Sequence, residues 1–73
     1  GEKMIQEQIK LKRESIGLSQ TQLAEKIGVR QQWIAQIEQG LRMPSLNSIM
    51  NMAKVFNCSI DELVEMDKFR KEV

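Results

Sequence analysis

The 73-residue sequence contains no histidine, no tyrosine, a single cysteine and a single proline. The lone Cys58 excludes an intrachain disulfide and is typical of a protein from a reducing compartment. Without histidine and with one cysteine, the chain lacks the ligands of a structural zinc site and the base of Ser-His-Asp or Cys-His catalysis. We therefore expect no metal, no cofactor and no enzymatic activity.

Long hydrophobic runs are also absent. No stretch approaches the roughly 20 apolar residues of a membrane span, and the chain does not open with the hydrophobic region of a signal peptide. Hydrophobic residues make up 41% of the chain and charged residues 29%, which is the profile of a folded globular domain. We expect one cytoplasmic domain over residues 1–73. The net charge of +1 is compatible with binding nucleic acid but does not require it.

The sequence contains the start and stop signals of short helices. It lacks the alternation of apolar and polar residues that is typical of strands. Ser19 and Ser59 each stand three residues before a Gln or Glu, as in a capping box, and a glycine follows each of the first three helical stretches. The pattern predicts an all-α fold, a compact bundle of five helices. The expected helices lie at about 2–16, 19–27, 31–39 and 45–57, with a fifth from 59 and a frayed tail at about 67–73.

The spacing of apolar residues predicts the buried face of each helix. Lys12 interrupts the apolar face of the first expected helix, so we expect the aliphatic part of its side chain to lie over the core. Cys58 is expected to be a small buried residue. The expected core positions are Ile5, Ile9, Ile16, Leu23, Ala24, Ile27, Ile34, Ile37, Leu46, Ile49, Met50, Ala53, Phe56, Ile60, Leu63 and Val64.

The most informative stretch is 20–39. Ala24 is small enough for two helices to pack closely, and Gly28 can supply the positive φ of a tight turn between them. The spacing resembles a helix-turn-helix. Together with the stretches 17–20 and 37–40, the order of five helices resembles the lambda repressor/Cro-like family, also called the XRE family, over about residues 9–63.

The third helix has one outward face rich in amides. At 100° per residue from Gln31, Ile34 and Ile37 fall at about 300° and 240°, which defines the buried side. Gln31, Gln32, Ala35, Gln36 and Gln39 fall between about 0° and 140°. A glutamine amide donates and accepts at once, which suits the edge of adenine, and a small alanine permits close approach to a thymine methyl. The alternative is an ordinary solvated face.

The resemblance implies that the third helix lies in the major groove of DNA. It implies base reading by Gln31, Gln32 and Gln36 and a phosphate contact by Gln20. From their residue types and their places beside the same surface, we also expect Ala35 to meet a base, and phosphate contacts by Arg30, Trp33, Gln39 and Arg42. The resemblance also suggests a structural ion pair between Arg13 and Glu38. Arg30 departs from the family, which often has a Ser or Thr there as the N-cap of the third helix.

The sequence thus predicts a sequence-specific DNA-binding transcriptional regulator of bacterial or phage type. The simplest form is a repressor that binds a palindromic operator as a homodimer through the fifth helix and tail, with Val64, Met66 and Phe69 at the interface. The alternatives are a protein-interaction or antitoxin-like module on the same fold, or the DNA-binding part of a longer regulator. We expect no small-molecule substrate and no membrane partner.

Overall fold

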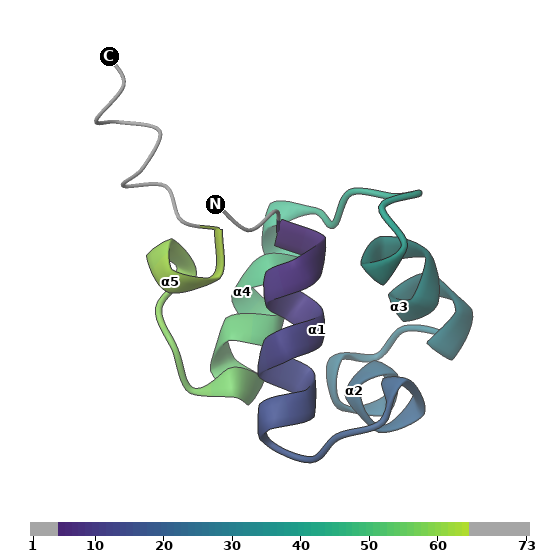
Figure 1. Ribbon diagram of the computed structural model, residues 1–73, viewed down its shortest axis with the longest axis horizontal. Coiled ribbons are helices and arrows are strands. Elements are labelled where there is room, and N and C mark those ends of the chain that lie inside the picture. The colour runs from purple at the N-terminus through teal and green to yellow at the C-terminus, as the bar shows by residue number, and fades with distance from the viewer. Residues whose placement is uncertain (1–4, 65–73) are drawn as a thin grey trace.

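The computed structural model describes residues 5–64, which form five helices and contain no strand. The helices are α1 (Ile5–Ser15), α2 (Gln20–Ile27), α3 (Gln31–Glu38), α4 (Leu46–Phe56) and α5 (Ile60–Val64). Helices α1 and α4 pack side by side, with α5 against one flank and α2 and α3 against the other (Figure 1). The all-α expectation is confirmed.

The helix boundaries follow the local capping signals of the sequence. The Ser19 hydroxyl accepts a hydrogen bond from the Gln22 backbone N–H (3.0 Å), and the Gln22 side chain accepts one from the Ser19 backbone N–H (2.8 Å). Ser59 and Glu62 repeat this arrangement before α5. Each such cap contributes about 1 kcal/mol to helix stability. Both predicted capping boxes are therefore confirmed.

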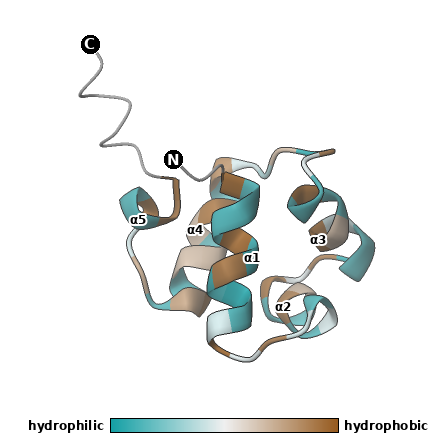
Figure 2. Cartoon of the chain, in the orientation of Figure 1, coloured by the Kyte–Doolittle hydropathy of each residue, from teal (hydrophilic) through white to brown (hydrophobic). Residues whose placement is uncertain are grey.

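The core lies where all five helices meet. Its largest fully buried side chains come from every helix and are Ile9, Leu23, Ile34, Ile37, Met52 and Leu63. Each helix carries both hydrophilic and hydrophobic residues, as expected for helices that cover a shared core (Figure 2).

Three of the predicted core positions are wrong. Ile16 follows the last residue of α1 and is 45% exposed, while Leu46 and Met50 are 66% and 41% exposed. The buried face of α4 instead contains Met52, Ala53 and Phe56. Leu46 and Met50 lie one turn apart on a neighbouring face of the same helix, which points to solvent.

The packing of α5 combines an ion pair with apolar contacts. Lys12 is half-buried, as its predicted position over the core requires, and its Nζ lies 3.5 Å from Glu62 Oε2. Cys58 is partly buried and packs against the core, and this burial raises the pKa of its thiol. Val64 is half-buried, whereas Met66, Phe69 and the predicted tail at 67–73 lie outside the described residues.

No helix in 5–64 combines the length and apolar character needed to cross a membrane.

Candidate nucleic-acid interface

Helices α2 and α3 are joined by a turn of three residues. Gly28 adopts the left-handed conformation at φ 77°, and the backbone N–H of Val29 donates to the carbonyl of Ala24 (2.9 Å). Ala24 is buried, and because its side chain is a single methyl group, α2 can pack closely against the core at this point. Arg30 takes the N-cap position of α3 in an extended conformation, and its side chain makes no cap hydrogen bond within the described part of the chain.

The outward face of α3 lies where the helical spacing places it. Ile34 and Ile37 are buried, whereas Gln31, Gln32 and Gln39 are exposed. Ala35 and Gln36 are half-buried. Amide groups therefore line the solvent side of this short helix.

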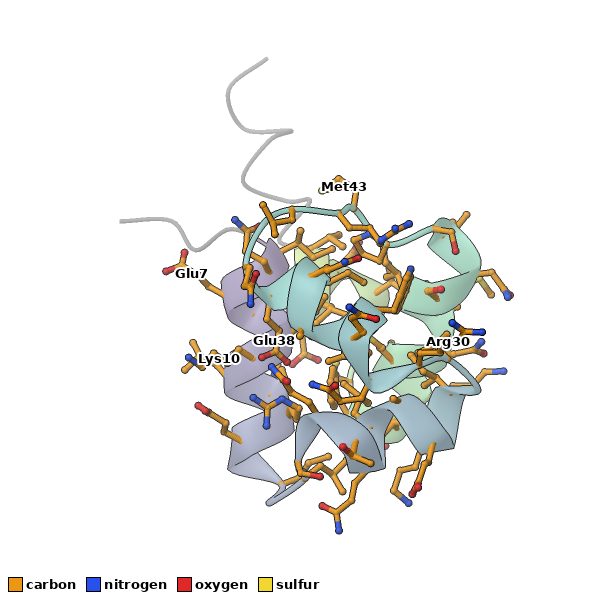
Figure 3. The ribbon with its side chains drawn as sticks, turned by 90° about the vertical axis from the view of Figure 1, so that its right-hand side faces the viewer. Glu7, Lys10, Arg30, Glu38 and Met43 are labelled. Carbon is orange, nitrogen blue, oxygen red and sulfur yellow. The ribbon has the colours of Figure 1, made fainter. Side chains whose placement is uncertain are left out.

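The predicted ion pair between α1 and α3 is confirmed. Arg13 Nε donates to Glu38 Oε2 (2.7 Å) and Arg13 Nη2 donates to Glu38 Oε1 (3.0 Å), while Arg13 Nη1 donates to the Leu18 carbonyl (2.8 Å). The hydrogen bond to Glu38 is the main reason that the pKa of Arg13 is raised. The Glu38 side chain is only 4% exposed and points between α3 and α1 (Figure 3). This pair fixes α3 against α1.

The ion pair continues into the amides of the outward surface, which sequence reasoning missed. Gln20 Nε2 donates to Glu38 Oε1 (3.1 Å), and Gln31 Nε2 donates to Gln20 Oε1 (2.8 Å). Because a carboxylate only accepts hydrogen bonds, Glu38 orients the Gln20 amide with its nitrogen inward. The first glutamine of α3 is therefore held by a chain of polar contacts that begins in the interior.

A second set of predicted residues gathers at the opposite side of the α3 face. A groove of about 290 Å³ is lined by Val29, Arg30, Gln32, Trp33, Gln36 and Arg42. Arg42 Nε donates to Gln36 Oε1 (3.1 Å) across its wall. Arg30 stands at the α2–α3 turn, at the other end of α3 from Glu38 (Figure 3). The structure thus brings together Arg30, Trp33 and Arg42, while Gln20 lies beside Glu38 and Gln39 caps α3.

Two helices joined by a tight glycine turn, with a polar outward face on the second, define a helix-turn-helix domain. A sequence profile of the helix-turn-helix family matches residues 9–63. The chain belongs to this family, and the expected likeness to lambda-type repressors is confirmed.

Known relatives agree with this assignment. A protein of Archaeoglobus fulgidus described as an uncharacterized HTH-type transcriptional regulator is 40% identical over 55 residues, covering 75% of this chain and 79% of that protein. The P22 c2 repressor in complex with a synthetic operator superposes with a TM-score of 0.81 at 25% identity, over 88% of this chain and 97% of that one. The biofilm regulator SinR in complex with DNA gives a TM-score of 0.77 at 34% identity, over 82% and 97%. The family and the fold are those of transcriptional regulators.

Proposed function

We propose that this protein is a sequence-specific transcriptional regulator that binds double-stranded DNA with α3 in the major groove. The observation that carries the proposal is the amide-lined outward face of α3, flanked by a groove that contains two arginines. Base edges in the major groove offer donors and acceptors in patterns that amides can match, and the arginines can hold the phosphates on either side. We propose no catalytic role for this surface.

The base-reading residues in this proposal are Gln31, Gln32, Ala35 and Gln36. Gln31 and Gln32 support it through their exposure at the start of α3, and Ala35 leaves room for a base to approach. The phosphate-contacting residues are proposed to be Gln20, Arg30, Trp33, Gln39 and Arg42.

The DNA-bound form is proposed to be a homodimer on a palindromic operator, in which residues 1–73 of each copy act as one domain. A single module of this kind contacts about 600–1,000 Å² of DNA, which gives modest affinity. A second copy, about 34 Å away along the duplex, would add the second half-site. The interface is proposed to lie at α5 and the tail and to use Val64, which is half-buried, with Met66 and Phe69, which lie outside the described residues.

The alternative function is a protein-interaction module on the same fold. The loop between α3 and α4 and the start of α4 expose large apolar side chains, with Leu41 73%, Met43 72% and Leu46 66% exposed. Figure 3 shows Met43 at the outer edge of that loop. Such a patch is a common feature of surfaces that bind another protein.

In-vitro selection from a random duplex pool at about 0.15 M salt tests the proposal, because specific binding is meaningful only at a stated salt concentration. The wild type is expected to enrich a two-fold symmetric site. Gln32→Ala is expected to lose or alter one base preference in each half-site while the protein stays folded. Lys10→Ala, a change on the exposed side of α1, serves as the matched control and keeps the wild-type motif. A folded wild type that enriches no motif would reject the regulator and favour the protein-interaction module.

A further inference from the structure

The end of α3 places Arg42 beside Gln36 through the backbone. Gly40 is left-handed at φ 80°, and its N–H donates to the Ile37 carbonyl (3.0 Å). The next N–H, that of Leu41, donates to the carbonyl of Gln36 itself (2.9 Å). This double closure is a Schellman motif, and it folds the chain back over the last turn of the helix. The side chain of Arg42 therefore begins next to Gln36, whose amide it contacts.

The contact orients the Gln36 amide so that its nitrogen end is the one free of a partner in the described residues. Arg42 Nε donates to Gln36 Oε1 (3.1 Å), so one of the two lone pairs of the amide oxygen is used and the oxygen lies beside a positive charge. The two N–H groups of Gln36 Nε2 remain for a ligand, together with the terminal N–H groups of the Arg42 guanidinium. This wall of the groove therefore presents mainly hydrogen-bond donors.

An amide that presents mainly its donors distinguishes between the purines. Guanine offers two acceptors in the major groove, N7 and O6, whereas adenine offers the N7 acceptor and the N6 amino donor. An unconstrained glutamine pairs with adenine by accepting from N6 and donating to N7. With Arg42 on one lone pair of its oxygen, Gln36 can accept from adenine N6 only through the other lone pair, where the adjacent guanidinium charge disfavours the approach of an amino donor.

We infer that Arg42 is a positioning residue that biases Gln36 toward donating hydrogen bonds and so makes the base pair read by Gln36 favour guanine over adenine. The inference rests on the proposed function, because it assigns a preference within the same α3 surface. It gives Arg42 a role in specificity beyond the proposed phosphate contact.

The test first identifies the operator base pair at which the Gln36→Ala variant loses the base preference of the wild type. Equilibrium binding is then measured to two operators that differ only at that base pair, one with guanine and one with adenine. The wild type is expected to prefer guanine over adenine there by about tenfold, the range of one good base contact. Arg42→Met keeps the length of the stem but removes every donor, and it should reduce this ratio to about twofold or less. Lys26→Met removes one positive charge from an exposed position on α2 and should leave the ratio unchanged.

A double-mutant comparison separates positioning from direct contact. In a Gln36→Ala background, Arg42→Met should leave the guanine-to-adenine ratio unchanged within twofold. If the ratio still changes in that background, Arg42 reads the base itself and the inference is overturned. It is also overturned if Arg42→Met weakens binding equally to both operators, which is the behaviour of a phosphate ligand. Retained helicity and melting temperature establish that each variant is folded. A folded wild type that binds neither operator above random DNA would reject the proposed function itself.

Discussion

The Arg13 guanidinium and the Glu38 carboxylate are joined by two hydrogen bonds of 2.7 and 3.0 Å, which tie α1 to the last residue of α3. The same carboxylate accepts a third hydrogen bond from Gln20, the first residue of α2. One buried carboxylate therefore connects both helices of the helix-turn-helix to the rest of the domain. Its removal is expected to affect stability and the presentation of the DNA-facing amides together.

Glu38→Gln should lower the free energy of unfolding by about 3 kcal/mol, because it removes the buried negative charge that accepts two hydrogen bonds from the buried Arg13 guanidinium. Glu14→Gln is the matched control, since Glu14 lies 3.8 Å from Arg13 Nη2 but its side chain is 51% exposed. An exposed pair of this kind contributes about 0–1 kcal/mol. Urea titration of both variants measures the difference, and equal losses would show that Glu38 has no special structural role.

Arg30→Ser should raise the stability of the fold and weaken DNA binding. The N-cap of α3 is an arginine without a cap hydrogen bond in the described residues, so a serine hydroxyl there should add about 1 kcal/mol of stability. The same change removes a proposed phosphate ligand, so affinity should fall and the slope of log K against log salt should shrink by about 0.9. Thermal melting and salt-dependent binding measure the two effects.

Arg30→Ala is the control for that variant. It removes the same charge but supplies no hydroxyl, so it should reproduce the loss of affinity without the gain in stability. Affinity and salt slope that remain at wild-type values in both variants would exclude Arg30 from the DNA interface.

Glu62 should make the melting temperature of the protein fall at acidic pH. The hydrogen bond from the Ser59 backbone and the nearby charge of Lys12 lower the pKa of this carboxylate below its ordinary value. A group with a depressed folded pKa stabilises the fold above its unfolded pKa, and this contribution is lost as the pH falls through the folded pKa. The wild type should therefore lose melting temperature below about pH 4.5 more steeply than Glu62→Gln does. Parallel curves for the two proteins would contradict the assignment.

The Cys58 thiol should react slowly in the native protein. Burial is the largest cause that raises its pKa, so less thiolate is present at a given pH than in the unfolded chain. The rate of reaction with a thiol-specific disulfide reagent at about pH 8 should rise when the protein is unfolded in urea. A native rate equal to the unfolded rate would show that the packing of this residue offers no protection.

The features that could be predicted from the sequence are those that depend on a few neighbouring residues. The capping box at Ser19, the left-handed Gly28 and the left-handed Asn57 after α4 are set by local backbone chemistry, and their residue types indicate them directly. The face of α3 also followed from its short, regular spacing. Local rules therefore predicted the helix ends and the orientation of the candidate site.

The features that could not be predicted depend on how helices pack. Met50 and Met52 each fit a helical stripe with Ile49, Ala53 and Phe56, and contact with the other helices decides between them in favour of Met52. The contacts of Gln20 with Glu38 and of Arg42 with Gln36 join residues from different elements, and their geometry needs the assembled fold. The glycine at position 40 was a usable signal for the second contact, because a Schellman turn brings the following residues back over the helix.

The most direct test of the central claim is methylation interference on the operator found by selection. Methyl groups on guanine N7 lie in the major groove, and those on adenine N3 lie in the minor groove. If α3 reads the major groove in a symmetric dimer, guanine N7 methylation should block binding in two clusters about one helical turn apart. Interference at adenine N3 alone, or none at guanine N7 within the selected site, would contradict the placement of α3 in the major groove.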